Sequence, residues 1–325
     1  MRAGWSSGSR PTPSKPRESA GQRCRHPAAG GREAMKTRYS FGGDEHIFVE
    51  MDEEMSLDAF FKSIAMTTAV KESGIKGVTE ICPANASMQV KYDPDVIKPD
   101  DMLAELKKFE SQAENAEKRM KTRIVEVPVY YRDPWTHECV MRFRERHQDP
   151  SGTDLDYAAR INGFDSVDAF IEAHHSNPWF VSMVGFVSGL PFLYQLVDRP
   201  RQLQVPKYLR PRTDTPKQTV GYGGCFGCVY SVRGAGGYQM FGITPMTIFD
   251  PQQKISYLRD FMVFFNPGDI VKWNPIGREE YDEIAAGVES GKWAPKIAEV
   301  DFDLEAFNAD IDGVNKKLME ALHGA

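Results

Sequence analysis

The segment TVGYGGCFGCVY at residues 219–230, followed by GAGGYQMFGIT at residues 234–244, decides the fold expected for the middle of this chain. Eight glycines fall within the forty residues 206–245, far above the usual fraction of about 7%. In a strand pattern, glycine marks tight turns, bulges or close approach of the backbone to another body. The segment therefore predicts either the corners of a β-barrel or a substrate platform whose backbone amides approach a ligand or a partner chain.

The surrounding pattern predicts an α+β protein. Residues 180–276 alternate short apolar runs with Gly and Pro clusters, which is typical of a β-barrel or sandwich. Residues 36–121 follow the order strand, helix, strand, strand, helix, which indicates an antiparallel sheet with helices on one face. We predict a small α+β domain over 36–121, a β-barrel domain over 122–277 and a C-terminal helical extension over 278–325.

Apolar spacing and capping residues locate the individual elements. A strand at 39–51 contains a turn at 42–44, two short strands follow within 78–92, and a further strand is expected at 123–131. The expected helices are 57–70, 102–120, 135–147, 155–159, 166–174, 279–289 and 304–322.

Residues 1–35 are predicted to be a disordered basic leader. Seven Lys or Arg side chains oppose two Glu side chains in residues 1–34, and no apolar stretch of a secretory signal is present. Met35 is the natural first residue of the folded part. Ala34-Met35-Lys36 resembles the turn that carries biotin, but no strand pattern precedes it, so no covalently bound biotin is expected.

Composition limits the function. Lys plus Arg is 40 and Asp plus Glu is 46, giving a net charge of −6, so a dedicated nucleic-acid binder is not expected. The five cysteines are an odd number spread along 325 residues, which favours a reducing, cytoplasmic setting over a disulfide framework. The apolar runs are too short to span a membrane, which takes about 20 residues.

Two pairs of reactive residues are interpreted as structural. Cys225 and Cys228 form a single CxxC. Structural zinc needs four ligands, usually from two such pairs, and a redox CxxC opens a helix, whereas this pair lies in a strand pattern. We interpret both cysteines as small hydrophobes and predict no metal site. Asp154 and Asp156 are interpreted as a pair at a loop and helix start.

Two other pairs keep alternative interpretations. His174 and His175 end a predicted helix, where a histidine can act as a general acid or base, or can satisfy the last carbonyls of the helix. Arg210 and Arg212 flank a proline, where they can bind a carboxylate-like anion or form a solvated basic loop.

The strings at residues 212–230 and 234–244 resemble the carboxyltransferase part of urea carboxylase. That region also occurs in stand-alone proteins: allophanate hydrolase subunit 1, KipI and the B component of bacterial 5-oxoprolinase. ARINGFDSV at 159–167, GDI at 268–270 and NPI at 274–276 match as well. The resemblance covers about residues 38–310, and the tail from 291 to 303 is most similar to the urea-carboxylase type.

The resemblance implies a small α+β domain followed by a cyclophilin-like β-barrel. It also implies half an enzyme, completed by a homologous carboxyltransferase subunit of the allophanate hydrolase subunit 2 or KipA type. In the urea-carboxylase type, a biotin carboxylase and a biotin carrier join the complex, and carboxybiotin on a partner delivers CO₂ to a urea nitrogen. In the 5-oxoprolinase type, an ATP-dependent complex with a LamB/YcsF-type protein opens a lactam. KipI-like members are regulatory modules that dock on a kinase.

Departures from the family pattern help to choose among these three functions. GFVSGL at 185–190 replaces the common Gly-Phe-x-Pro-Gly-Phe. Gln218-Thr219 and residues 226–228 lack the Gly-Ser and Gln-Thr-Gly of the lactam-opening type. These differences favour the urea-carboxylase type, whereas His174 fits the KipI-like pattern.

The chemistry implied by the resemblance assigns roles to residues. An amide nitrogen that attacks CO₂ needs a base for its proton and hydrogen-bond donors for the developing oxyanion. We assign catalytic roles to His174, Tyr238 and Gln239. The predicted substrate-binding residues are Lys207, Tyr208, Arg212, Gly223, Gly224, Gly236 and Gly237. Because carboxybiotin or ATP belongs to the complex, the isolated chain is expected to be inactive.

Overall fold

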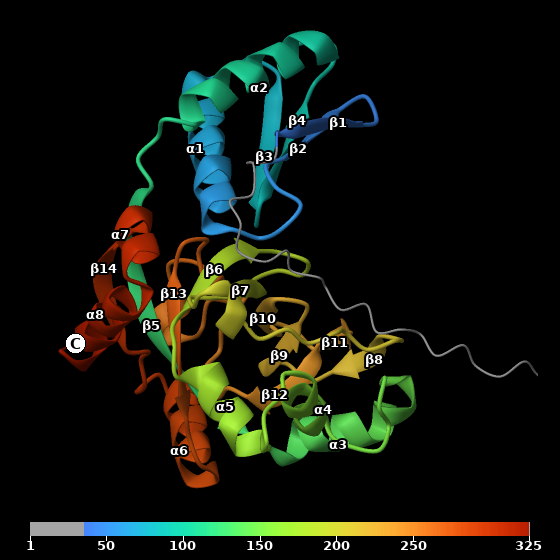
Figure 1. Ribbon diagram of the computed structural model, residues 1–325, viewed down its shortest axis with the longest axis vertical. Coiled ribbons are helices and arrows are strands. Elements are labelled where there is room, and N and C mark those ends of the chain that lie inside the picture. The colour runs from blue at the N-terminus through green and yellow to red at the C-terminus, as the bar shows by residue number, and fades with distance from the viewer. Residues whose placement is uncertain (1–35, 325) are drawn as a thin grey trace, which may run out of the picture. The chain divides into compact units, whose positions relative to one another are not determined.

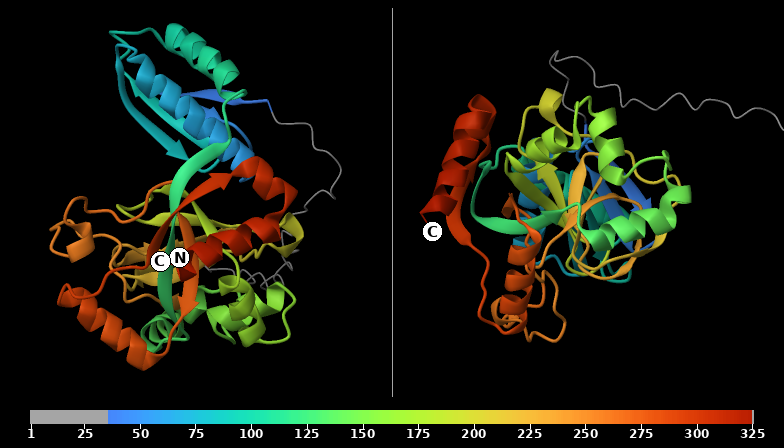
Figure 2. Two further views of the ribbon diagram at one scale, coloured as in Figure 1. Left: turned by 90° about the vertical axis from the view of Figure 1, so that its left-hand side faces the viewer. Right: turned by 90° about the horizontal axis from the view of Figure 1, so that it is seen from below.

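The computed structural model describes residues 36–324, and the structural statements below concern these residues. The leader predicted at residues 1–35 lies outside them, as do Ala34 and Met35 of the biotin-like tripeptide. Two larger β-sheets and the helices packed against them form a mixed α/β fold (Figures 1 and 2).

The first sheet is antiparallel, with strand order β1-β2-β4-β3. Alternation gives β4 a buried face, with Met88 and Val90 fully enclosed, and an open face that exposes Gln89. Two helices pack on the buried face (Figure 1). These elements are β1 (Arg38–Gly42), β2 (His46–Glu50), α1 (Leu57–Ser73), β3 (Val78–Ala84), β4 (Ser87–Tyr92) and α2 (Pro99–Ala113).

Local chemistry sets the bounds of these elements. The Ser56 side chain accepts a hydrogen bond from the Ala59 amide at 3.1 Å, which caps the start of α1. The helix ends at Gly74, whose φ of 62° suits glycine best. The turn predicted at 42–44 divides the first expected strand into the β1–β2 hairpin.

The second sheet has eight strands in the order β12-β9-β10-β7-β6-β13-β5-β14. Strand β13 runs parallel to β5, and β12 makes an additional antiparallel pairing with β5. The bounds are β5 (Arg119–Tyr131), β6 (Trp179–Val184), β7 (Pro191–Gln195), β9 (Thr219–Gly223), β10 (Phe226–Val229), β12 (Gln239–Ile243), β13 (Ile270–Pro275) and β14 (Ile297–Asp303). A separate two-stranded sheet pairs β8 (Arg212–Thr215) with β11 (Gly234–Gly236).

The pairing of β12 with β5 depends on Gly242. This residue lies opposite Tyr131, and a Cβ atom at Gly242 would come within 2.6 Å of the Tyr130 carbonyl oxygen. Glycine therefore permits an approach of the β12 backbone to β5 that any side chain would prevent.

Three helices lie between β5 and β6 in the chain, and three follow β13. Helices α3 and α4 pack near β12, α5 packs near β13, and α8 lies beside β14 and β5 (Figures 1 and 2). None of the helices within residues 36–324 combines the length and apolar character needed to cross a bilayer. Their bounds are α3 (Pro134–Phe143), α4 (Asp154–Ile161), α5 (Val167–His175), α6 (Arg278–Glu289), α7 (Leu304–Ala309) and α8 (Ile311–His323).

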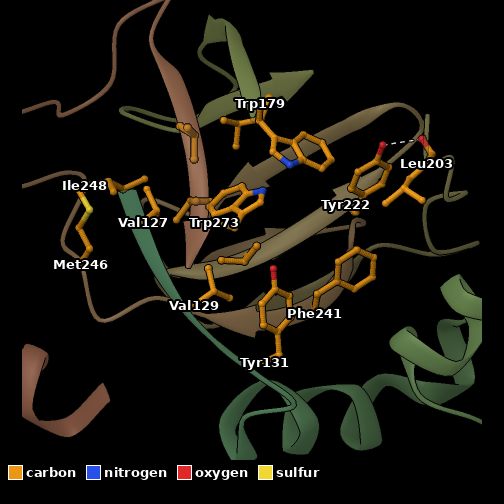
Figure 3. Packing of buried hydrophobic residues seen from close by; sticks show 14 of the residues in the cluster. Val127, Val129, Tyr131, Trp179, Leu203, Tyr222, Phe241, Met246, Ile248 and Trp273 are labelled. Atoms are coloured by element: carbon orange, nitrogen blue, oxygen red, sulfur yellow. Dashed lines mark hydrogen bonds between the residues drawn. The ribbon is translucent and has the colours of Figure 1, made fainter. Parts of the chain in front are cut away.

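Aromatic rings fill the hydrophobic core formed by the large sheet and the segments packed against it (Figure 3). Trp179, Tyr222 and Trp273 are completely buried there. The His174 imidazole lies among these rings, stacked on Trp273 with centroids 5.8 Å apart, and its Nδ1 is 2.8 Å from the Tyr131 hydroxyl. Burial lowers the pKa of His174 to about 3, so the ring is neutral at physiological pH.

The C-terminal extension differs from the prediction of two helices. Residues 297–303 form β14, which adds to the edge of the large sheet beside β5. The sequence IAEVDFD alternates apolar and acidic residues and has only Phe302 fully buried, so its strand pattern is weak. The helix expected at 304–322 is divided into α7 and α8, because the Asp310 side chain accepts a hydrogen bond from the Gly313 amide at 2.9 Å and starts a new helix.

The helix expected at 102–120 also ends early, at Ala113. The chain from Arg119 onward is extended, because Met120 pairs with Phe302 of β14. Strand β5 therefore crosses the domain boundary predicted between residues 121 and 122. The partner strand lies far along the chain, and local periodicity could not have revealed it.

The buried imidazole predicts an acid-dependent loss of stability. The folded state holds His174 with a pKa of about 3 against 6.5 in the unfolded chain. The unfolded state therefore binds the extra proton as the pH falls below 6.5, and this contribution to stability decreases by about 1.4 kcal/mol per pH unit until the pH reaches about 3. We expect His174→Gln to flatten the pH dependence of the free energy of unfolding between pH 7 and pH 5, measured by urea denaturation.

His137→Gln is the matched control, because His137 is exposed on α3. This variant should keep the wild-type slope. Equal slopes in the wild type and the His174→Gln variant would contradict the buried neutral state.

Candidate functional site

A pocket of about 290 Å³ lies beside the glycine-rich strands. Its walls come from β7, β10, β11 and two connecting segments, 186–190 and 207–211. Aromatic rings and backbone form most of its surface, and Lys207 is the single charged residue that lines it. The lining residues are Phe186, Leu190, Phe192, Lys207, Tyr208, Pro211, Cys228, Tyr230, Ala235, Gly236, Gly237 and Tyr238.

The pocket brings together half of the predicted site residues. These are Lys207, Tyr208, Gly236, Gly237 and Tyr238. The Lys207 ammonium nitrogen lies 5.1 Å from the centroid of the Tyr238 ring, within cation–π distance. Burial raises the pKa of Tyr238, so its hydroxyl stays protonated and can donate a hydrogen bond to a ligand.

Glycine at position 236 shapes this wall. Gly236 pairs with Arg212 in the small sheet, and a Cβ atom at Gly236 would overlap the Tyr230 hydroxyl. The bare backbone therefore lets the Tyr230 ring line the pocket. The Gly237 carbonyl accepts a hydrogen bond from the Tyr208 amide at 2.8 Å, which joins the turn to the 207–211 segment.

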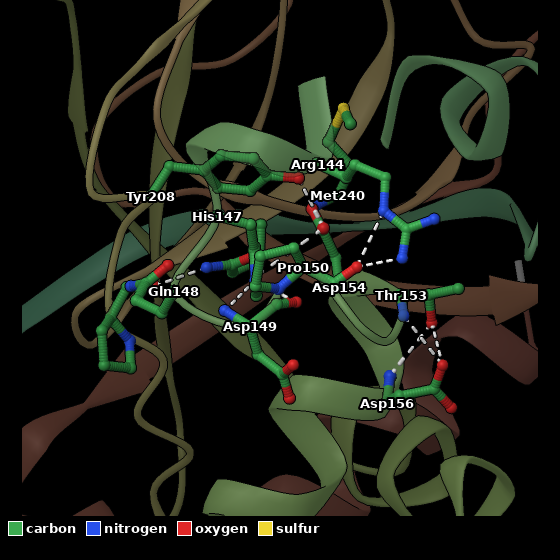
Figure 4. Close-up of polar contacts among 12 residues, drawn as sticks. Arg144, His147, Gln148, Asp149, Pro150, Thr153, Asp154, Asp156, Tyr208 and Met240 are labelled. Carbon is green, nitrogen blue, oxygen red and sulfur yellow. Dashed lines mark hydrogen bonds and ion pairs between the residues drawn. The ribbon is translucent and has the colours of Figure 1, made fainter. Parts of the chain in front are cut away.

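A buried carboxylate holds the pocket wall from behind (Figure 4). Asp154 is 1% exposed. Its Oδ1 accepts a hydrogen bond from the Tyr208 hydroxyl at 2.5 Å, and its Oδ2 accepts one from the Met240 amide at 2.7 Å. Burial raises the pKa of Asp154, and these hydrogen bonds oppose the shift. Asp154 and Asp156 were both interpreted from the sequence as structural, and their roles differ. Asp154 binds Tyr208 and Met240, whereas Asp156 completes a capping box with Thr153.

Gln239 points away from the pocket and makes a second buried link. Its Nε2 donates a hydrogen bond to the Pro206 carbonyl at 2.8 Å, and its Oε1 lies 2.7 Å from His147 Nε2. Because the amide oxygen must accept, His147 Nε2 carries the proton, and Nδ1 accepts a hydrogen bond from the Asp149 amide at 2.8 Å. Both ends of the Gln239 side chain are therefore hydrogen-bonded within the chain, and its Nε2 holds the segment that carries Lys207. The catalytic role assigned to Gln239 stays a prediction.

Three other predicted residues lie outside the pocket lining. His174 is enclosed in the aromatic core and is not among the residues that line the pocket, so its catalytic role stays a prediction. Gly223 is buried where a Cβ atom would overlap the Tyr238 ring, so it supports the wall from behind. Gly224, with φ of 68°, forms the exposed turn between β9 and β10.

Arg212 lies directly behind the pocket wall. The side chain is completely buried, and its guanidinium carbon is 4.4 Å from the centroid of the Tyr208 ring. Its Nε donates a hydrogen bond to the Thr215 hydroxyl at 3.3 Å. The guanidinium also lowers the pKa of the Tyr208 and Tyr230 hydroxyls, against the upward effect of burial. The predicted alternative of a solvated basic loop is therefore wrong for Arg212, although Arg210 is exposed.

The two cysteines of the CxxC lie in different surroundings. Cys228 is buried in the pocket wall, where burial raises the pKa of its thiol. Cys225 packs against a separate cluster of buried hydrophobic residues that includes Phe180 and Tyr194. No group of three or more His, Cys, Asp or Glu in the described chain is arranged to hold a metal ion.

Several lining residues are absent from the set predicted from the sequence. Cys228 and Tyr230 occur in the segment that suggested the fold, and their i, i+2 spacing places both on one face of β10 and its continuation. Phe186 lies in GFVSGL, which the sequence shows only as a departure from the family pattern. It has φ of 69° and is 71% exposed at the pocket.

The pocket lining offers few groups for acid–base chemistry, and Lys207 and Cys228 are the residues in it that carry an amine or a thiol. Its twelve lining residues include no carboxylate and no imidazole. Burial keeps the hydroxyls of Tyr208, Tyr230 and Tyr238 protonated, because it raises the pKa of each.

A family model, the curated relatives and a solved structure all relate this chain to the same family. The family model for the carboxyltransferase domain, subdomains C and D, matches residues 37–258. Urea amidolyase of Lachancea kluyveri is 27% identical over 290 residues, which cover 86% of this chain and 16% of that protein. The B component of Bacillus subtilis 5-oxoprolinase is 28% identical over 258 residues, covering 76% of this chain and 97% of that protein.

The crystal structure of the Kluyveromyces lactis urea amidolyase superposes with a TM-score of 0.76 at 27% identity. The match covers 89% of this chain and 18% of that one. The chain thus spans less than a fifth of the urea amidolyases that it matches. Since the family model covers more than half of the sequence, the chain belongs to the carboxyltransferase-domain family.

Proposed function

We propose that this chain is one component of a biotin-dependent, urea-carboxylase-like carboxyltransferase that acts on an amide or urea nitrogen. The family supports an enzyme component, and the extent of the match to urea amidolyase supports this type. In this proposal β12 and β5 close a cyclophilin-like barrel, and the pocket beside β10 and β11 is one wall of the active site.

The observation that carries the proposal is the composition of the pocket. Its aromatic walls and volume of about 290 Å³ suit a small planar group, but its lining includes no carboxylate or imidazole. Carboxybiotin carried by a partner would supply the CO₂, and this chain would hold the acceptor. Tyr238 and the Gly236–Gly237 turn form the binding wall, and Lys207 provides positive charge toward the developing carboxylate.

Exposed apolar side chains support a shared active site. Phe186 and Leu209 are 71% and 74% exposed, and both belong to segments that line the pocket. Large apolar side chains at a pocket mouth are typical of a surface that another protein covers. We propose that a homologous carboxyltransferase subunit docks here and supplies the missing acid–base groups.

The second candidate function is the corresponding component of an ATP-dependent 5-oxoprolinase. It is favoured by the match to the Bacillus subtilis protein, which is aligned over 97% of its length. That relative is itself named as one part of a larger assembly, so both candidates need a partner. They differ in whether turnover requires biotin on the partner or ATP-dependent ring opening.

The first test concerns the binding wall. In a complex reconstituted from the full chain, the homologous subunit and the biotin proteins, we expect Tyr238→Phe to reduce the rate of biotin-dependent carboxylation about tenfold or more, because a donor to the oxyanion is lost. Gln239→Ala should reduce it comparably by releasing the 206–208 segment. Tyr281→Phe, on α6 and outside the pocket, is the control.

Wild-type turnover in the Tyr238→Phe variant would remove Tyr238 from the mechanism. ATP-dependent turnover by the pure chain alone would contradict the shared active site.

The second test concerns docking. We expect the double substitution Phe186→Ser and Leu209→Ser to weaken binding of the homologous subunit about tenfold or more, since large apolar anchors dominate such interfaces. Biolayer interferometry with the immobilised subunit measures the change. Phe41→Ser is the matched control, because Phe41 is 50% exposed but lies on β1, outside the pocket segments. Equal losses in both variants would exclude docking at the pocket mouth.

A further inference from the structure

Four arginines gather on one surface beside the pocket, which we call the arginine surface. Helix α3 supplies one of them in its last turn, and the short helix η1 (Arg144–Arg146), which follows α3 directly, supplies another. The other two come from the segments before β8 and β11, and contacts between α3 and β8 bring these segments together (Figure 1). The members of the arginine surface are Arg142, Arg146, Arg210 and Arg233.

A shared carboxylate and a shared ring connect three of these side chains. Arg142 Nη2 and Arg233 Nε each donate a hydrogen bond of 2.7 Å to the Asp214 carboxylate. The guanidinium carbons of Arg142 and Arg146 lie 5.0 and 5.3 Å from the centroid of the Phe143 ring, within cation–π distance. The hydrogen bond from Arg233 is the main reason why the pKa of Asp214 is lowered to about 2, so this carboxylate stays charged and holds both guanidiniums.

Arg210 connects the arginine surface with the pocket mouth. Its amide donates a hydrogen bond to the Arg146 carbonyl at 3.2 Å, and the Arg146 guanidinium donates one to the Pro211 carbonyl at 2.7 Å. Pro211 and Lys207 both line the pocket, and the exposed Arg210 lies between them in the chain. A protein bound to the arginine surface would therefore lie next to the pocket.

Positive charge is in excess on this surface, although the whole chain has a net charge of −6. Six Lys or Arg and a single acid, Glu145, occur in the three segments that form it, which are residues 142–146, 207–211 and 231–236. Arg146 and Arg210 form no ion pair with an acid within residues 36–324, and the other two members share one carboxylate. Acids of the chain itself therefore leave much of this positive charge without a partner.

We propose that the arginine surface binds a carboxylate-rich segment of another protein and holds that protein beside the pocket. The guanidinium group suits this ligand, because its planar donors match the two oxygens of a carboxylate. Association driven by opposite charges is fast and sensitive to salt, which suits a partner that binds and leaves repeatedly. This inference goes beyond the proposed function, since it does not depend on which reaction the pocket supports.

The charge of the whole chain favours a protein segment over a nucleic acid. The phosphates of a nucleic acid would extend past the arginine surface and meet the acidic remainder of a chain whose net charge is −6. A short acidic segment can contact the arginine surface alone. Asp214 and Phe143 already hold Arg142 in place, so less side-chain entropy is lost when such a segment binds.

Two peptides that differ only in charge test the proposal. A short fluorescent peptide of alternating Glu and Ser is compared with the same peptide in which Gln replaces Glu. In fluorescence anisotropy titrations of the full chain at low salt, we expect the Glu peptide to bind about tenfold or more tightly, because charge-assisted hydrogen bonds form only with carboxylates. This preference should decrease as the salt concentration rises, because ions screen charges that are exposed to solvent.

Matched double variants locate the binding surface. Arg210→Gln combined with Arg233→Gln should reduce the preference about fivefold or more, because two of the four guanidiniums are lost. Arg119→Gln combined with Arg259→Gln removes the same charge from β5 and from the segment between β12 and β13, which supply no member of the arginine surface. All four side chains are exposed, and the second double variant should keep the wild-type preference.

Equal binding of the two peptides would overturn the proposal. An equal loss of preference in both double variants would also overturn it, because the effect would then be one of net charge. Tighter binding of a single-stranded DNA of similar length, weakened by the Arg210 and Arg233 substitutions, would assign the surface to nucleic acid instead. The proposed carboxyl transfer is judged separately, by turnover in the reconstituted complex, so either proposal can fail while the other stands.

Discussion

The Asp154 carboxylate is the interaction on which the candidate site depends. It starts α4 and binds both Tyr208, in the pocket wall, and the amide of Met240, in β12. Hydrogen bonds to a charged group stabilise by about 1.5–3 kcal/mol each, so this single side chain joins three segments that are distant in sequence. Loss of the carboxylate would leave a buried hydroxyl and a strand amide unsatisfied and would free the wall of the pocket.

A second buried link acts in parallel. Gln239 connects His147 with the Pro206 carbonyl, immediately before Lys207. The hydrogen bonds of Asp154 and Gln239 reach the 206–208 segment from two different elements, α4 and β12. Lys207 is therefore held in place through its backbone and not through contacts between its ammonium group and acids. This arrangement keeps the pocket side of Lys207 available while the structure behind it is rigid.

The pocket and the aromatic core differ in their chemical character, although each contains residues that were predicted to lie together in the functional site. The core around His174 excludes water and holds a neutral imidazole, which suits stability more than catalysis. The pocket has rings, bare backbone and positive charge but no acid–base group among its lining residues. In the proposed function a partner subunit supplies the missing groups, and Phe186, which lines the pocket, is exposed.

The sequence alone predicted the element order of residues 36–121 and the β-rich character of residues 180–276. These features follow from local periodicity and from the conformational needs of glycine, which neighbouring residues express directly. Lys207, Tyr208 and the Gly236–Tyr238 turn were assigned to one site through the family resemblance, and the structure places them around one pocket. Only the tertiary structure decided which way Gln239 and Arg212 face, and that His174 is enclosed in the core. It also decided that residues 297–303 join the large sheet. Side-chain direction and strand pairing depend on residues more than a hundred positions away, as in the pairing of Met120 with Phe302, and local sequence patterns do not encode such contacts.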